Sequence, residues 1–324
     1  MQKDYLKIAG NVHLAYYVEA ADELGIKYEI IFRNLTARFE ADGKHWFINN
    51  TALPITNAPS ARLARGKHLA NAILTKAGIP VPKQLKAQNL EDVMNFFYEN
   101  KEIVLKPSQN LGGKGISILP STPTDVKQAY EYAKDHDKTG TVLVEQYIHG
   151  ENYRILAIRD KVVGVVRRLP ATVEGDGEKT IAQLIETENI ERKARFLMPI
   201  PVDEETVKHL SHKGLTLESV LEEGKSSTVR SNTNLTTGGT TEECSNIMHP
   251  YYEDLALKTL NALGLEFGGI DLITQDITQP APCAINEVNY NPGLRLHYKV
   301  DKGEVKKVAV PIMEYIRDRY TGKK

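Results

Sequence analysis

The chain has 324 residues, and its 41 lysines and arginines nearly balance its 42 aspartates and glutamates, for a formal net charge of −1. Such a balance gives no general attraction to nucleic acid or to an anionic membrane, so small-molecule partners are favoured. The only cysteines, Cys244 and Cys283, lack metal-binding spacing, which argues against a disulfide scaffold or a zinc site. Because the N-terminus lacks the apolar core of a signal peptide and no run of about 18 apolar residues occurs, we expect a soluble cytoplasmic protein.

Residues 1–84 predict a small α/β lobe that ends in a linker helix. The expected elements are helices over residues 13–24 and 60–77, a strand over residues 28–32 and a hairpin over residues 37–49. Ser60 is the expected N-terminal cap of the second helix, and Gly78 ends it. Lys67 lies on this helix, where a lysine without further context would be an exposed surface residue.

Residues 85–150 predict a central lobe with a glycine-rich loop. Helices are expected over residues 90–99 and 123–135, and strands over residues 103–105, 116–119 and 141–148. The first of these strands leads to Lys106, and the loop after it carries Gly112, Gly113 and Gly115. Glycine backbone N–H groups can approach an anion closely and a lysine adds charge, so we expect phosphate binding here. An ordinary turn is the alternative, and the loop is not a Walker A loop because neither Ser nor Thr follows Gly-Lys.

Residues 151–324 predict a larger lobe that is interrupted by a charged stretch. The expected elements are a hairpin over residues 152–168 and helices over residues 180–188, 216–222, 250–263 and 306–320. Residues 176–224 contain few apolar positions, so we expect an insertion without a core of its own. A polar loop over residues 229–239 follows, with Arg230 near its start and two glycines at its end.

Polar side chains gather on a second hairpin, which is expected over residues 267–297. Side chains alternate between the faces of a strand, so Glu287, Asn289 and Asn291 share one face. Several oxygen ligands converge if Asp271 on the neighbouring strand points the same way. Mg²⁺ is held by one or two carboxylates together with nucleotide phosphates and water, so this hairpin is a candidate metal site. The alternative is a hairpin with a solvated polar face.

Taken in order, these motifs resemble the ATP-grasp superfamily. The resemblance covers roughly residues 60–318 and extends to the ATP-grasp portions of cyanophycin synthetases and of bifunctional glutamate-cysteine ligase/glutathione synthetases. Similar stretches are Tyr153-Arg-Ile-Leu, Val162-Val-Gly-Val-Val, Gly175-Asp-Gly-Glu-Lys-Thr-Ile, Arg230-Ser-Asn-Thr-Asn-Leu-Thr-Thr-Gly-Gly and Glu287-Val-Asn-Tyr-Asn-Pro-Gly. The order and spacing of several motifs make the resemblance specific.

The resemblance implies an α+β (α/β) ATP-grasp fold of three lobes, residues 1–84, 85–150 and 151–324, with ATP between two antiparallel sheets. The implied phosphate-binding residues are Lys67, Lys106, Gly112, Gly113 and Gly115. The implied adenine and ribose contacts are Glu145, Gln146, Ile148, Glu151 and Asn152. The implied ligands of two Mg²⁺ ions, or of Mn²⁺ in their place, are Asp271, Glu287 and Asn289. Relatives often carry Asp where Asn152 stands, so the ribose contact departs here from the pattern of those families.

The implied activity is an ATP-dependent carboxylate-amine ligase that forms an amide bond through an acylphosphate. Its implied catalytic residues are Arg230, Asn234 and Lys106, and its candidate residues for an amino-acid or peptide substrate are Arg154, Asn291, Arg295 and His297. The alternatives to a substrate-binding role for His297 are that it is packed in the interior or lies at the surface. This chain lacks the Mur-ligase-like and cysteine-ligase domains of the two families, so neither full activity is implied.

Two other classes stay open from the sequence. A phosphotransferase with the same fold would release a stable phosphorylated product, and a regulatory protein would bind nucleotide without turnover. Relatives commonly assemble as dimers or tetramers, so we expect a homodimer or homotetramer.

Overall fold

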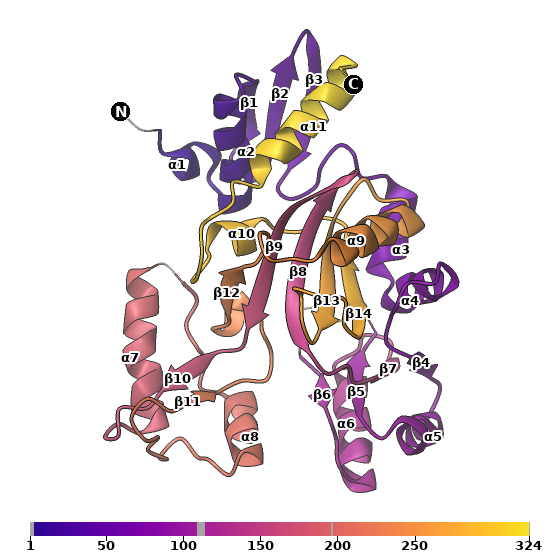
Figure 1. The fold of residues 1–324 in the computed structure, drawn as a ribbon, viewed down its shortest axis with the longest axis vertical. Coiled ribbons are helices and arrows are strands. Elements are labelled where there is room, and N and C mark those ends of the chain that lie inside the picture. The colour runs from indigo at the N-terminus through magenta and orange to yellow at the C-terminus, as the bar shows by residue number, and fades with distance from the viewer. Residues whose placement is uncertain (1–2, 109–113, 196, 324) are drawn as a thin grey trace. The chain divides into compact units, whose positions relative to one another are not determined.

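The computed structural model describes residues 3–108, 114–195 and 197–323, and Figure 1 shows its chain path. The helices are α1 (Tyr5–Ala9), α2 (Val12–Glu23), α3 (Ala58–Arg65), α4 (Lys67–Lys76), α5 (Leu90–Asn100), α6 (Pro123–Asp135), α7 (Ile181–Ala194), α8 (Glu204–His212), the 3-10 turn η1 (Leu235–Thr237), α9 (Pro250–Leu263), α10 (Arg295–Tyr298) and α11 (Ala309–Thr321). The strands are β1 (Lys27–Phe32), β2 (Thr36–Ala41), β3 (Lys44–Asn49), β4 (Gln84–Ala87), β5 (Ile103–Pro107), β6 (Ser117–Ile118), β7 (Val142–Gln146), β8 (Glu151–Ile158), β9 (Lys161–Leu169), β10 (Thr172–Glu174), β11 (Ser226–Thr228), β12 (Thr240–Glu243), β13 (Phe267–Thr274) and β14 (Cys283–Asn289). Within the described ranges, no helix is both long and apolar enough to cross a membrane.

Contacts between residues divide the chain into two compact units. The first unit comprises Met1–Val166, Glu243–Lys299 and Glu304–Lys324, and the second unit comprises Arg167–Glu242 and Val300–Gly303. The strand pairs β1–β2, β4–β7, β5–β7, β8–β13 and β13–β14 are antiparallel. These antiparallel sheets, mixed with helices, confirm the expected α+β class. The lobe boundaries expected after residues 84 and 150 stay predictions.

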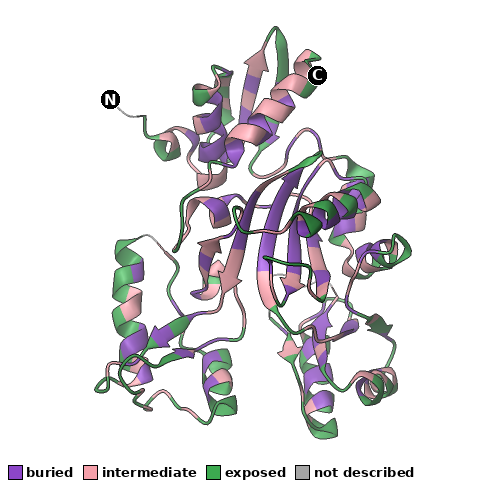
Figure 2. Cartoon of the chain, viewed as in Figure 1, coloured by how far each residue is buried: buried purple, intermediate pink, exposed green. Residues whose placement is uncertain are grey.

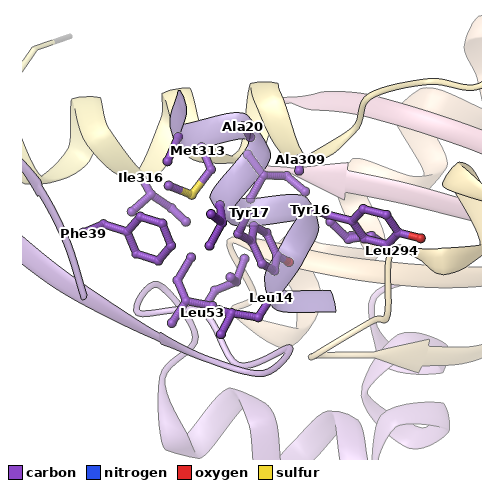
Figure 3. Close-up of a cluster of buried hydrophobic side chains, with 14 of the residues drawn as sticks. Leu14, Tyr16, Tyr17, Ala20, Phe39, Leu53, Leu294, Ala309, Met313 and Ile316 are labelled. Atoms are coloured by element: carbon purple, nitrogen blue, oxygen red, sulfur yellow. The ribbon is translucent and has the colours of Figure 1, made fainter. Parts of the chain in front are cut away.

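Both ends of the chain contribute to one part of the first unit, which we call the N-terminal module: helices α1, α2 and α11 with strands β1, β2 and β3. Figure 1 shows α11 beside α2 and β3, although these elements lie at opposite ends of the sequence. Tyr17 and Phe39 are buried in the module's core together with Met313 of α11 (Figure 3). The hairpin predicted over residues 37–49 is confirmed, and the turn between β2 and β3 has Asp42 (φ 49°) and Gly43 (φ 72°) both at positive φ, as a tight two-residue hairpin requires.

A five-stranded sheet in the order β12-β9-β8-β13-β14 carries several candidate site residues. Successive side chains of β8 point to opposite faces, and both faces are covered. Tyr153, Ile155 and Ala157 belong to a buried cluster shared with α4 and α9, whereas Leu156 and Ile158 belong to the core of the N-terminal module. Figure 2 shows that β8 and β13 are buried along most of their length. Polar side chains on these strands are therefore held by packed neighbours.

A four-stranded sheet in the order β4-β7-β5-β6 packs against helices α5 and α6. Its core joins Phe97 of α5 and Val126 of α6 to Ile103 and Leu105 of β5. The strand expected to lead to Lys106 is confirmed, but it continues past that lysine to the end of β5. Lys106 is thus a strand residue rather than a loop residue.

The single helix expected over residues 60–77 is wrong in two respects. Gly66 (φ −82°, ψ 93°) leaves the helical conformation and separates α3 from α4. The cap of α3 is Asn57 rather than Ser60, because the Asn57 side chain accepts a hydrogen bond from the Ser60 backbone N–H at 2.9 Å. The break makes Lys67 the first residue of α4.

The second unit corrects the expectation that residues 176–224 lack a core. Ile181, Ile185 and Leu210 are buried in a cluster of the second unit's own. Val229, which lies outside the stretch, belongs to the same cluster. The stretch therefore shares a core with the residues on both sides of it in the sequence.

The helices expected in the second unit are confirmed only in part. Residues 180–188 lie in the longer α7, but residues 216–222 form no helix, and Val220 pairs with Thr180 in an antiparallel bridge. Sequence reasoning missed α8, whose cap Asp203 accepts a hydrogen bond from the Thr206 backbone N–H at 3.1 Å. This missed helix supplies partners for a predicted catalytic residue.

Candidate active site

Lys106 and Glu145 form a buried ion pair in the first unit. They lie on the adjacent strands β5 and β7, with Lys106 Nζ 2.5 Å from Glu145 Oε2. Glu145 also accepts a hydrogen bond from Nε2 of Gln84 on β4. Gln84 was missed from the sequence because its pairing with Glu145 depends on the alignment of strands distant in the chain.

Lys67 joins the same group of charges from helix α4. Burial is the main cause that lowers the pKa of Lys67, and the positive charge of Lys106 lowers it further. The carboxylates of Glu287, Glu145 and Asp271 oppose this shift. Lys67 is half-buried, so the alternative of an exposed surface lysine is wrong.

Lys67 also stands at an unusual position for a cation. The N-terminal end of a helix carries a partial positive charge on its unpaired backbone N–H groups. The N-terminal cap of the ten-residue helix α4 is Gly66, which has no side chain to accept hydrogen bonds from these N–H groups. The ammonium group of Lys67 adds a second positive charge at this end of the helix. An anion such as phosphate would neutralise both charges, so the start of α4 is suited to bind one.

Asp271 of β13 is paired with an arginine on one neighbouring strand and lies opposite a glutamate on the other. Arg154 of β8 donates hydrogen bonds to both carboxylate oxygens, through Nε and through Nη2 at 3.2 Å from Asp271 Oδ2. Glu287 of β14 lies opposite Asp271 in the register of the hairpin. The hairpin expected from the sequence is confirmed, whereas the ion pair with Arg154 was not expected.

The predicted metal ligands fit a site that a nucleotide would complete. Within residues 3–108, 114–195 and 197–323, no three His, Cys, Asp or Glu side chains are grouped as a metal site. The predicted set has two carboxylates, Asp271 and Glu287. On the same strand as Glu287, Asn289 adds an amide oxygen as the third possible ligand, whereas its buried Nδ2 is a hydrogen-bond donor that has no partner among the described residues. Because Mg²⁺ needs only one or two carboxylates when phosphate and water supply its other ligands, this donor set is suited to it.

Beyond β14, the chain carries the predicted substrate residues Asn291, Arg295 and His297. Arg295 begins α10, and the side-chain oxygen of Asn291 is buried without a partner among the described residues. His297 is 1% exposed, so it is packed and the surface alternative is wrong. It lies so close to Gly164 that a Cβ at that glycine would be 2.8 Å from His297 Nδ1.

His297 gives a testable dependence of stability on pH. Burial, with the positive charge of Arg154 adding to it, lowers the pKa of His297 to about 3, below the value of about 6.5 for an unfolded histidine. Between these values the unfolded chain binds a proton that the folded chain does not, so stability falls as the pH falls from about 6.5 toward about 3. Each pH unit within this window costs about 1.4 kcal/mol.

The measurement is urea unfolding of the wild type and of His297→Asn at pH 6 and pH 5. The wild type should lose about 1 kcal/mol more than the variant over this interval, because the variant lacks the titrating group. A difference between the two proteins that does not change with pH would show that His297 titrates normally in the folded chain.

The described part of the glycine-rich loop begins at Lys114, so the predicted residues Gly112 and Gly113 lie outside the described residues. Gly115 has φ +77°, which disfavours any residue with a Cβ. A Cβ at Gly115 would lie 2.6 Å from both Pro107 and His136. Glycine is therefore required at this position by backbone conformation and by space.

The other predicted nucleotide contacts, Gln146, Ile148, Glu151 and Asn152, lie around the connection between β7 and β8. All are half-buried. Glu151 accepts a hydrogen bond from the Tyr153 hydroxyl at 2.7 Å. Their contacts with adenine and ribose stay predictions.

Arg230, a predicted catalytic residue, is held by α8 within the second unit. Its Nη1 donates to Asp203 Oδ1 at 2.6 Å and to Thr206 Oγ1 at 2.9 Å, and its Nη2 donates to Glu205. These partners were missed because the helix that begins after Asp203 was not expected. Asn234, the other predicted catalytic residue of this unit, caps the 3-10 turn η1.

Comparison with known proteins agrees with this architecture. The family model of the prokaryotic glutathione synthetase ATP-grasp domain matches residues 74–220. The cyanophycin synthetase of Crocosphaera subtropica is 34% identical over 267 residues, which cover 79% of this chain and 31% of that protein. The glutathione biosynthesis bifunctional protein of Clostridium perfringens is 31% identical over 269 residues, which cover 79% of this chain and 34% of that protein. This chain thus spans about a third of the length of these relatives.

A solved structure resembles almost the whole chain. The crystal structure of a bifunctional glutathione synthetase from Pasteurella multocida has a TM-score of 0.70 and 26% sequence identity, over 97% of this chain and 44% of that one. The likeness confirms the fold expected from the motifs. The domain matched over residues 74–220 and the likeness in fold agree that this chain carries an ATP-grasp domain and has the ATP-grasp fold.

Proposed function

We propose that the chain is an ATP-dependent ligase that joins a carboxylate to an amine on an amino-acid or small-peptide substrate. The observation that carries the proposal is the cluster of opposite charges in the first unit. Lys67 and Lys106 lie there with the carboxylates of Glu145, Asp271 and Glu287. Such a cluster combines cations for phosphate groups with oxygen ligands for a metal, and an ATP-dependent reaction requires both.

ATP is the proposed phosphoryl donor. Lys67, at the positively polarised start of α4, and Lys106 are suited to bind its phosphates. Gln146, Ile148, Glu151 and Asn152 are the proposed contacts of adenine and ribose. Asp271, Glu287 and Asn289 would hold two Mg²⁺ ions, or Mn²⁺ in their place, and the metal would neutralise phosphate charge when bound.

The proposed reaction has two steps. A carboxylate oxygen of the substrate attacks the γ-phosphorus, the bond from that phosphorus to ADP breaks, and an acylphosphate forms. The amine nitrogen then attacks the acyl carbon, the bond from that carbon to the phosphate oxygen breaks, and the nitrogen loses a proton. Arg230 and Asn234 are the proposed donors to the charged oxygens that develop, since preorganised donors of this kind stabilise such transition states.

The substrate is proposed to be recognised by residues around β14. Arg295 is the proposed partner of a substrate carboxylate, and Asn291 offers a buried oxygen that has no partner among the described residues. Arg154 and His297 are themselves buried, and Arg154 already binds Asp271. Their proposed role is therefore to hold the site rather than to reach into solvent. An acidic amino acid is the favoured substrate class.

We also propose that the protein acts in the cytoplasm as a homodimer or homotetramer. Its near-neutral net charge and its two cysteines, which lack metal-binding spacing, support a cytoplasmic enzyme with small-molecule substrates. Light scattering of the purified chain measures the oligomeric state directly.

The proposal is tested by ADP release with Mg-ATP against a matrix of acidic amino acids and peptides paired with amines. Release that needs both partners, with a product at their summed mass less water, is the expected result. Release with the acid alone and a stable phosphorylated product would instead indicate a phosphotransferase. Binding of Mg-ATP without release across the whole matrix would favour a regulatory protein.

A further inference from the structure

Buried polar atoms without a hydrogen-bond partner gather around one segment of the first unit. Among the described residues, these atoms include Asn289 Nδ2, Asn291 Oδ1 and both ring nitrogens of His297. Nδ1 of His13, on helix α2, belongs to the same class. A buried polar group left unpaired costs about 1–3 kcal/mol, so such groups are retained where a ligand or ordered water pairs with them.

His13 lies directly against the turn that follows the predicted metal ligands. A Cβ on Gly293 would be 2.7 Å from His13 Cε1, with the ring nitrogens Nδ1 and Nε2 at 3.3 Å and 3.4 Å. The Cε1 corner of the imidazole therefore faces the Asn-Pro-Gly turn, and of the two nitrogens beside it Nδ1 is the one buried without a partner among the described residues. Only glycine at position 293 leaves room for the ring.

The rest of helix α2 fixes His13 in this position. Tyr16, one turn further along α2, stacks on Tyr298 of α10 with ring centroids 3.8 Å apart and planes 14° from parallel. Tyr16 and Leu294 both belong to the core of the N-terminal module (Figure 3). Helix α2 thus packs on both ends of the segment that carries Arg295.

The charge around His13 defines what its ring can bind. Burial lowers the pKa of His13, and the positive charge of Arg295 lowers it further. A neutral imidazole has one nitrogen that donates and one that accepts. The guanidinium of Arg295 is suited to a carboxylate, and the oxygen of Asn291 is suited to an ammonium group.

We infer that His13, on helix α2, is a substrate-binding residue whose Nδ1 contacts an acidic α-amino acid held by Asn291 and Arg295. The inference rests on the proposed function and extends it, because no motif places a site residue in the N-terminal module. It assigns the module a role in selecting the substrate. A ligand with ammonium and carboxylate groups matches the mixture of donors and acceptors that His13, Asn291 and Arg295 present.

The test is calorimetric titration of L-aspartate into the full chain with Mg²⁺ and a non-hydrolysable ATP analogue. His13→Ala should weaken L-aspartate binding about tenfold or more, the loss expected for a buried hydrogen bond to a charged group. His13→Asn keeps a polar atom near the position of Nδ1 and should bind within about threefold of the wild type. His45→Ala, at an exposed histidine of β3 in the same module, is the matched control and should bind as the wild type does.

Two further readouts separate substrate binding from packing. The affinity for the ATP analogue should be the same in all four proteins, and the melting temperature of each variant should lie well above the temperature of the titration. Three outcomes would overturn the inference. The wild type and His13→Ala could bind L-aspartate equally well, or the wild type could fail to bind it. The third is a loss of affinity in His13→Ala that His13→Asn does not restore.

ADP release distinguishes this inference from the proposed function. If L-aspartate binding depends on His13 but no amine gives ADP release, the assignment of His13 stands and the proposed ligase function is wrong. If ADP release needs L-aspartate and an amine but the KM for L-aspartate is unchanged in His13→Ala, the proposed ligase function stands and the assignment of His13 is wrong.

Discussion

Replacing Asp271 by alanine should destabilise the first unit by about 3–5 kcal/mol, because it leaves the buried guanidinium of Arg154 without its partner. Arg154 and Asp271 are 8% and 5% exposed, and Arg154 donates to both oxygens of the carboxylate. Removing one member of such a pair exposes the full desolvation cost of the other charge. The same change should abolish Mg²⁺-dependent ADP release, since Asp271 is a proposed metal ligand. Urea unfolding and ADP release measure the two effects.

The double variant Arg154→Met/Asp271→Leu separates fold from function. A buried ion pair replaced by apolar side chains of similar volume is often neutral for stability, so the double variant should recover most of the lost free energy of unfolding. It should not recover Mg²⁺-dependent nucleotide binding. A double variant that binds nucleotide with the Mg²⁺ dependence of the wild type would contradict the assignment of Asp271 as a ligand.

Arg230→Ala should lower turnover by about 10²–10³, the usual effect of removing one preorganised donor to a developing charge. Nucleotide affinity should change little, because Arg230 is proposed to act in the transition state. The measurement is kcat with saturating substrates, together with the dissociation constant of a non-hydrolysable ATP analogue.

A structural role is the alternative for Arg230, since Asp203 and Glu205 hold its guanidinium within the second unit. Arg192→Ala is the matched control. Arg192 is 3% exposed in the same unit and donates to the Met198 carbonyl at 2.7 Å, but it is not a proposed catalytic residue. Equal losses of turnover in Arg192→Ala and Arg230→Ala would contradict a catalytic role and indicate that both changes act through the fold of the second unit.

Local sequence signals predicted most strands and several helix ends. The β2–β3 hairpin, the β13–β14 hairpin and the end of α9 before Gly264 depend on residues close together in the chain. Turn-forming and helix-ending residues act locally, so their effects are readable without the fold. Helix α4 shows the limit, because the apolar pattern continues across Gly66 and concealed the break before Lys67.

Contacts between elements that are distant in the chain could not be predicted from such local signals. Leu217 has helical spacing with Val220 and Leu221, yet the bridge between Thr180 and Val220 holds this segment in an irregular conformation. The motifs located Arg230 but not its partner Glu205. His13 carried no signal, because only the packing of α2 on Tyr298 brings it to the Asn-Pro-Gly turn.

Isotope transfer from the acid substrate tests the proposed ligase most directly. The acid and amine that give ADP release are supplied with the carboxylate of the acid labelled with ¹⁸O, and the released phosphate is analysed by mass spectrometry. Attack by the carboxylate on the γ-phosphorus, followed by loss of phosphate to the amine, predicts that each released phosphate carries one oxygen from the substrate. Phosphate without label, with all ¹⁸O retained in the acid or its product, would contradict an acylphosphate and with it the central proposal.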